Sequence, residues 1–146
     1  MASIDLQRLK LAAYPLTRTL TTRVSDMDGN GHLNAIRIGH LYEDARAAFY
    51  GVAFEGLPRI RAVVAELKIR YLREGRWPGE VEVATGIESF GGRSYVMVQG
   101  LFQAGLCIGL CDTVLVNTAH GHAAPLPEAN LAGLERMRLR DVPAAV

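Results

Sequence analysis

The sequence lacks the features of a membrane-bound or nucleic-acid-binding protein. No uncharged run approaches the ~20 apolar residues that a helix needs to cross a bilayer, and the first residues already carry Asp5, Arg8 and Lys10. Sixteen basic residues against fifteen acidic ones leave a formal charge of +1, too little for the positive field that non-specific nucleic-acid binding requires. We therefore expect a cytoplasmic protein with no membrane and no nucleic-acid partner.

Cysteine is scarce as well. Cys107 and Cys111 are the only two, and both stand in one apolar segment. At a spacing of four along a strand, their side chains would point to the same face, too far apart to form a disulfide with each other. We expect two buried free thiols.

Several common catalytic centres are missing. The sequence contains no Gly-x-Ser-x-Gly elbow and no phosphate-cradling glycine loop, and Ser94 has no base that the sequence identifies. His120 and His122 stand in a proline-containing tail without a carboxylate or thiol at ligand spacing, and Asp26 and Asp28 lack the further ligands of a calcium loop. We expect no metal and no organic cofactor.

What the chain does contain is enough apolar material for one core. It has 146 residues, of which 49% are hydrophobic, which predicts a single domain over residues 1–146. Residues 1–14 form an N-terminal extension in this interpretation. Residues 119–146 form a C-terminal tail, with a short helix expected over 128–138.

Hydrophobic periodicity predicts one long helix over residues 35–50. Its apolar positions recur at i, i+3, i+4, i+7 and i+11, namely Ile38, Leu41, Tyr42, Ala45 and Phe49. Asn34 is suited to cap the start of this helix, and Gly51 to end it.

Alternating patterns predict strands on either side of the helix. Period-two alternation predicts strands over 65–72 and 80–88, and threonine and branched residues predict one over 15–24. A hairpin at Gly91-Gly92 leads into a strand over 94–102, and the segment 106–117 is apolar on both faces, as in a strand in the middle of a sheet or at a subunit interface. One helix cannot cover a five-stranded sheet by lying beside it, so the sheet should curl round the helix. We therefore expect an α+β fold, with an antiparallel sheet of about five strands wrapped around one central helix. The open edge of such a sheet invites dimerisation.

The turn between the first strand and the helix is rich in polar and small residues. Ser25–Asn34 reads S-D-M-D-G-N-G-H-L-N. Asp, Asn and Gly are what any loop before a helix contains, so capping alone would explain it. A catalytic interpretation takes the carboxylate of Asp28 as a general base or nucleophile. The free first-turn amides, near Asn34 and Ala35, would then stabilise an oxyanion.

This turn and the helix after it resemble the hotdog-fold acyl-CoA thioesterases, in the 4-hydroxybenzoyl-CoA thioesterase-like branch. The similarity covers about residues 17–117. That branch has a pattern similar to Asp-x-Asp-x-x-Gly-His-Val-Asn-Asn, followed on the helix by Glu-x-Ala-Arg. The matching positions are Asp26, Asp28, Gly31, His32, Asn34, Glu43, Ala45 and Arg46. Ala35 and Ile38 depart from it, replacing an asparagine and a tyrosine, so any polar help from those side chains must come from elsewhere or be absent.

The resemblance implies roles for the residues of the turn. The second aspartate of the pair is the catalytic one in this branch, which implies Asp28 and leaves Asp26 a structural role. His32 would orient Asp28, bind substrate or pack for structure. Asn34 would cap the helix, alone or while also touching the thioester. Ala35 could still supply its backbone amide, because that role needs no side chain.

A coenzyme A substrate would bring phosphates that need cations, and arginine suits phosphate by its planar fork. Arg70 and Arg73 stand towards the end of one predicted strand. Arg93 and Ser94 belong to a hairpin that is similar to the family's turn into the strand along which pantetheine passes. We expect these four residues to bind substrate.

The predicted function is therefore hydrolysis of an acyl-CoA to the free acid and coenzyme A. The site would be shared between two subunits of a homodimer, or of a tetramer built from two dimers. Two alternatives stay open. One is a thioesterase for acyl carrier protein, and the other is a non-catalytic acyl-CoA-binding hotdog domain, against which the presence of Asp28 argues.

Overall fold

The computed structural model describes residues 3–144 and shows an α+β fold. The helices and strands are β1 (Leu16–Thr21), α1 (Ala35–Ala53), β2 (Ala62–Tyr71), β3 (Glu80–Phe90), β4 (Ser94–Gln103), β5 (Leu106–Ala119), β6 (His122–Ala123) and α2 (Glu128–Arg136). Short 3₁₀ helices are η1 (Leu6–Leu9), η2 (Leu11–Ala13) and η3 (Val24–Asp26). Among the described residues, no helix combines the length and the apolar character that crossing a membrane requires.

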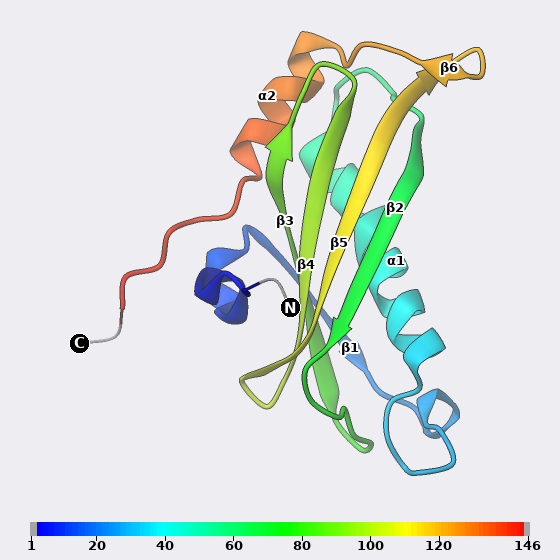
Figure 1. Ribbon diagram of the computed structural model, residues 1–146, viewed down its shortest axis with the longest axis vertical. Helices are drawn as coiled ribbons and strands as arrows, with labels where there is room; N and C mark the ends of the chain where they lie inside the picture. Colours follow the sequence, from blue (N-terminus) through cyan, green and yellow to red (C-terminus); the bar gives the residue numbers. More distant parts are fainter. Residues whose placement is uncertain (1–2, 145–146) are drawn as a thin grey trace.

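The strands form one curled antiparallel sheet in the order β1-β3-β4-β5-β2, and the two-residue β6 pairs with the end of β5. The sheet curves round α1, which lies along its inner face (Figure 1). The expected fold class is confirmed: a sheet of five main strands wraps one long helix. This order leaves β1 and β2 at the two edges of the sheet.

Helix α1 packs on the sheet through the predicted stripe. Ile38, Tyr42, Ala45 and Phe49 are buried against the inner face. The Oδ1 atom of Asn34 accepts a hydrogen bond from the Ile36 N–H at 2.8 Å, as expected of an N-cap. The predicted stop at Gly51 is wrong, because the helix continues to Ala53. Ala53 is buried in the core, and that contact favours another turn of helix.

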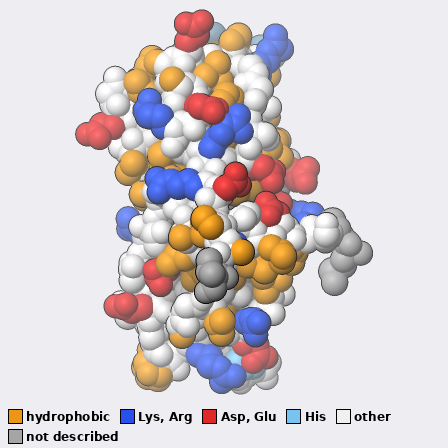
Figure 2. Space-filling view, turned by 90° about the vertical axis from the view of Figure 1, so that its left-hand side faces the viewer, with side chains coloured by type: hydrophobic (Ala, Val, Ile, Leu, Met, Phe, Trp, Pro, Cys, Tyr) orange, Lys and Arg blue, Asp and Glu red, His pale blue; other side chains and the backbone are white. Residues whose placement is uncertain are grey.

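Both ends of the described chain cover the outer face of the sheet. Residues of η1, η2 and the segment after α2 pack on Ala84, Val98, Phe102 and Leu110. Arg8 is 5% exposed, forms an ion pair with Asp112 of β5, and donates to the Cys111 carbonyl at 3.2 Å. Figure 2 looks at this side of the molecule, where charges of both signs are mixed among hydrophobic side chains. The N-terminal extension is therefore part of the folded core.

The two cysteines are buried free thiols, as predicted, but they do not share a face. Cys107 packs in the outer cluster and Cys111 in the inner one. The cause is a register shift, since Leu101 pairs with Gly109 whereas Phe102 pairs with Cys107, which leaves Ile108 as an extra residue in β5. Such a bulge reverses the alternation of side chains along a strand.

The edge strand β2 is unusually exposed for an apolar strand. It pairs only with β5, so the backbone groups along its other side have no strand partner within residues 3–144. Val63, Val64, Leu67 and Tyr71 are between 45% and 55% exposed. An apolar edge with free backbone groups can pair with another strand.

Candidate functional site

The turn before α1 holds the Asp28 carboxylate by backbone hydrogen bonds. Its Oδ1 atom accepts from the Asn30 N–H at 2.8 Å and from the His32 N–H at 3.1 Å. The Asp28 N–H in turn donates to the His32 carbonyl at 2.8 Å, which closes the turn. Gly31 has a φ of +79°, a conformation that glycine adopts without strain. The side chain of Asp28 is thus placed at the foot of the helix.

These contacts favour the charged form of the Asp28 carboxylate. The backbone N–H groups of His32 and Asn30 stabilise the ionised form and lower the pKa of Asp28 below its ordinary value of 3.8. Asp28 is therefore ionised at neutral pH, as a general base or nucleophile must be.

Asp26 is held differently and plays a structural part. It is 4% exposed, and its Oδ2 atom accepts from the Arg23 N–H at 2.8 Å. Its carbonyl accepts from the Asn34 N–H at 2.8 Å. Asp26 therefore fixes the two sides of the turn to each other.

That last bond corrects one expectation about the oxyanion donors. The Asn34 amide is not free, because it donates to Asp26, and the Ile36 amide donates to the Asn34 side chain. The Ala35 N–H has no hydrogen-bond partner within residues 3–144. Of the two amides expected to serve, Ala35 alone is open to a ligand.

The loop between β2 and β3 contacts the turn before α1 and holds it in place. The Nε2 atom of His32 lies 2.9 Å from Oε2 of Glu74, and Arg76 lies 3.6 Å from the same carboxylate. The Leu33 N–H donates to the Gly75 carbonyl at 2.9 Å. A Cβ atom on Gly75 would stand 2.3 Å from Leu33 Cδ1, so a larger residue here would have to displace the Leu33 side chain. Glu74 was not predicted, since nothing in the sequence links it to a residue so far back in the chain.

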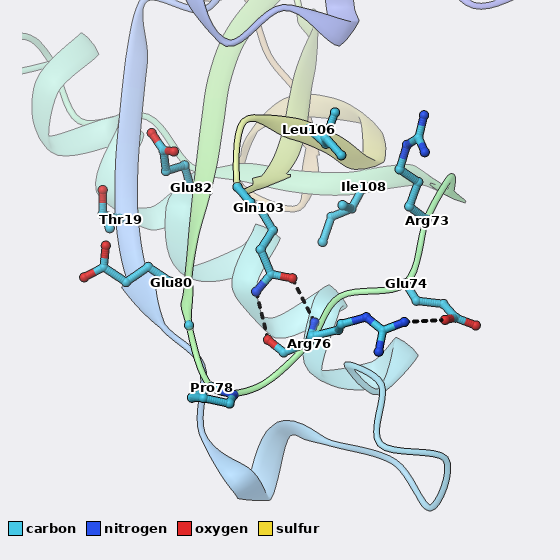
Figure 3. A pocket seen from close by; sticks show the side chains of 12 residues that line it. Thr19, Arg73, Glu74, Arg76, Pro78, Glu80, Glu82, Gln103, Leu106 and Ile108 are labelled. Carbon is cyan, nitrogen blue, oxygen red and sulfur yellow. Dashed lines mark hydrogen bonds and ion pairs between the residues drawn. The ribbon is translucent and has the colours of Figure 1, made fainter.

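A cavity lies beside this loop (Figure 3). Its volume is about 840 Å³. Inside it, the Gln103 side chain accepts a hydrogen bond of 2.8 Å from the Arg76 N–H and donates one of 2.8 Å to the Arg76 carbonyl. The charged side chains that line it are Glu74, Glu80, Glu82, Arg73 and Arg76. Because carboxylates outnumber guanidinium groups, the cavity does not select a phosphate. Asp28 is not among its lining residues.

The four predicted substrate-binding residues do not gather around Asp28 within one chain. Arg73 lies in the loop that contacts the turn before α1, and Arg70 lies in β2 opposite Leu110. Arg93 and Ser94 lie at the other end of the sheet, beside Val116 (Figure 1). The length of β5 from Gly109 to Val116 separates the two ends by roughly 23 Å. A hairpin's sequence does not tell which end of the sheet it occupies relative to a distant turn.

Comparison with known proteins defines the class of this fold and site. A family profile described as the thioesterase-like superfamily matches residues 22–134, which is most of the chain. This chain belongs to the thioesterase-like superfamily. No curated protein sequence matches it.

Three solved structures are similar in fold. A predicted thioesterase from Bacillus stearothermophilus is 26% identical with a TM-score of 0.78, covering 86% of this chain and 98% of that one. A thioesterase from Thermus thermophilus, complexed with coenzyme A and Zn, is 27% identical with a TM-score of 0.76, covering 86% and 95%. A mutant of 4-hydroxybenzoyl-CoA thioesterase complexed with 4-hydroxybenzoyl-CoA is 12% identical with a TM-score of 0.73, covering 82% and 97%, and shows the shared fold alone. The resemblance seen in the sequence is thereby confirmed.

Proposed function

We propose that this protein is a cytoplasmic acyl-CoA thioesterase that releases a free acid and coenzyme A without a metal or organic cofactor. One observation carries the proposal: in a chain of the thioesterase-like superfamily, backbone N–H groups hold an ionised carboxylate, Asp28, at the foot of a helix whose Ala35 amide is unpaired. An ionised carboxylate in the turn and a backbone N–H donor at the start of the helix are the two groups that attack on a thioester carbonyl requires.

The chemistry needs only these groups and water. As a general base, Asp28 takes a proton from a water molecule whose oxygen attacks the thioester carbonyl. The Ala35 N–H stabilises the oxyanion, the C–S bond breaks, and the thiolate leaves and takes up a proton. As a nucleophile, Asp28 attacks the carbonyl itself, the C–S bond breaks and the thiolate leaves and takes up a proton; water then cleaves the mixed anhydride, which releases the acid and restores the Asp28 carboxylate. Both routes use the same placement of Asp28 and Ala35. His32 orients Asp28 through its backbone N–H, and Asn34 caps the helix.

The proposed partner is a second copy of this chain, paired along β2. In a two-fold antiparallel pair centred on Leu67, Glu66 faces Lys68 of the partner subunit, and the reverse pair forms across the axis. Leu67 and Tyr71, which are about half exposed in one chain, would then be covered. The strand is self-complementary in both charge and apolar surface.

Antiparallel pairing would also bring the predicted substrate-binding residues of one subunit close to Asp28 of the other. It turns the partner end for end, so that Arg93 and Ser94 of the partner subunit lie at the same end as Asp28. In this arrangement Arg93, with Arg73 and Arg70, would meet the phosphates of coenzyme A.

The test is thiol release from a panel of short, long and aromatic acyl-CoA esters by the purified wild-type protein. We expect turnover of at least one ester without added metal, and unchanged by a chelator. Turnover of acyl carrier protein thioesters alone would contradict the proposed substrate. Tight retention of acyl-CoA without turnover would contradict catalysis.

A second prediction concerns Glu74 as a positioning residue. The Glu74→Gln variant should lose about 10-fold in kcat with KM little changed, because the turn that presents Asp28 loses its charged contact to His32. Steady-state kinetics on the best ester measure both constants. Glu74→Asp should recover part of the lost kcat.

The matched control is Glu80→Gln. Glu80 lines the same cavity but has no contact with His32 or Arg76 among the described residues (Figure 3). Its kcat should stay at the wild-type level. Equal losses in the Glu74 and Glu80 variants would show that charge in the cavity, and not the link to His32, is responsible.

A further inference from the structure

A second cavity lies between the edge strand β1 and helix α1. Its volume is about 420 Å³, and it shares no lining residue with the cavity beside the β2–β3 loop. Leu20 and Leu41 form its apolar floor, since both are partly buried against the inner core cluster. Asp28 is not among its lining residues. Its charged or titratable side chains are Arg18, Arg23, Asp26, Arg37, His40 and Asp44.

Both carboxylates of this cavity already have arginine partners within it. Oδ2 of Asp44 lies 2.9 Å from Nε of Arg18. Asp26 is 4% exposed, and its Oδ2 atom accepts from the Arg23 N–H at 2.8 Å. The guanidinium group of Arg23 also contacts Asp26, at 3.4 and 3.5 Å. The acceptors that the cavity offers are therefore in use.

The donors of the cavity, in contrast, are in surplus. A guanidinium group carries five N–H donors, and the ion pair of Arg18 involves only its Nε atom. The terminal nitrogens of Arg18 make no hydrogen bond with residues 3–144. Arg37 and His40 are exposed on α1, and neither side chain has a hydrogen-bond or ion-pair partner in the described part of the chain. Such a cavity suits a ligand that only accepts, and phosphate oxygens meet that condition.

The cations stand at both ends of the cavity. Arg37 and Asp44 are seven residues apart on α1, which corresponds to about 10 Å along the helix axis. Arg18 lies at the Asp44 end because it pairs with that residue, and Arg37 lies at the other end. One phosphate group cannot reach both arginines, whereas two or three linked phosphates can.

The cavity remains open in the proposed dimer. All of its lining residues belong to one chain, and β1 forms the edge of the sheet opposite to β2. Pairing of two subunits along β2 therefore leaves the β1 side uncovered. A ligand there needs no residue from a second subunit.

We propose that this cavity binds a ligand with two or three linked phosphates, such as a nucleoside diphosphate, at a site separate from the thioesterase centre. Arg18 and Arg37 hold the phosphates from the two ends, and Arg23 contributes from the turn. Leu20 and Leu41 give the nucleoside an apolar surface. The inference goes beyond the proposed function and does not depend on it, because binding requires no turnover.

The test is calorimetric titration of magnesium-free ADP into the purified protein at about 50 mM salt, where charge–charge attraction is only partly screened. We expect saturable binding of one ADP per chain. Arg37→Gln and Arg18→Gln should each weaken it by at least about 10-fold, since each removes charge-assisted hydrogen bonds to phosphate. Circular dichroism checks that both variants are folded.

The matched control is Arg136→Gln. Arg136 is also an exposed arginine on a helix, lies outside the cavity and has no ion pair within residues 3–144. The variant should bind ADP as wild type does. An equal loss in the Arg37 and Arg136 variants would show that only net charge matters and would overturn the site, as would the absence of saturable binding to the wild type.

Two further ligands define what the site reads. AMP should bind at least about 10-fold more weakly than ADP, because a single phosphate reaches one end of the cavity. AMP binding as tight as that of ADP would overturn the need for linked phosphates. Tripolyphosphate as tight as ATP would support the phosphate contacts and overturn the contact of the nucleoside with Leu20 and Leu41.

A comparison of two variants separates this site from that of the thioester substrate. Arg93→Gln removes a proposed contact to coenzyme A, so it should raise KM for the best ester and leave ADP binding unchanged. Loss of ADP binding in Arg93→Gln with retention in Arg37→Gln would place the nucleotide at the substrate's own site and overturn the proposal. A wild-type protein that hydrolyses no ester but binds ADP would overturn only the proposed function.

Discussion

In the Asp28→Asn variant we expect kcat for thiol release to fall by at least about 100-fold, the scale on which a positioned base acts. Asparagine keeps the shape of the side chain and can still accept hydrogen bonds from the Asn30 and His32 N–H groups. It carries no negative charge and cannot take a proton from water or attack a carbonyl. The loss therefore reports chemistry and not collapse of the turn, and thiol release with the best ester measures it.

The control for this variant is Asp44→Asn. Asp44 is an exposed carboxylate on α1 that pairs with Arg18 at 2.9 Å and has no hydrogen bond or ion pair with Asp28 among the described residues. Its removal should leave kcat unchanged. Activity of Asp28→Asn within a few-fold of wild type would move the catalytic role to another residue.

The second large effect is expected at the centre of the edge strand. Leu67→Asp would place two carboxylates opposite each other on the two-fold axis, and like charges directly opposite destabilise a strand pair. Their burial in the interface adds a desolvation cost. We expect a monomer at micromolar concentration and loss of nearly all thioesterase activity, because each site needs both chains. Light scattering after gel filtration measures the first, and thiol release the second.

The proposed pair of Glu66 with Lys68 of the partner subunit allows a charge-swap test of the same interface. Lys68→Glu alone should weaken the dimer, since it faces Glu66 of the partner subunit. Adding Glu66→Lys restores opposite charges and should restore the dimer. A single variant that stays dimeric, or a double variant that stays monomeric, would contradict the proposed pairing.

Much of the fold could be predicted because its signals are local. The helix follows from five apolar positions at helical spacing, and β2 and β3 follow from alternation. The errors arose where packing overrides local preference. Burial of Ala53 carries α1 past Gly51, and one extra residue at Ile108 sends Cys107 and Cys111 to opposite faces. The spacing of residues along β5 cannot reveal this bulge, because it is defined only by the pairing of β5 with β4.

The candidate site divides in the same way. The segment from Asp28 to Ala35 is continuous in sequence, so its geometry could be anticipated from turn and helix chemistry. Glu74 comes from a distant part of the chain and is placed beside His32 by the sheet. Arg93 shows the limit most clearly, because within one chain it lies at the opposite end of the sheet from Asp28, and only the proposed dimer would bring the two together.

The covering of the outer face has a practical consequence. Residues 22–134, the stretch shared with other members of the superfamily, leave out the segments that shield Phe102, Val98 and Leu110 from water. A protein truncated to that stretch would expose the apolar outer face of the sheet to water. It would also lack Arg8, the ion-pair partner of Asp112. For this protein the shared stretch is not a self-sufficient unit, and expression vectors should retain both flanks.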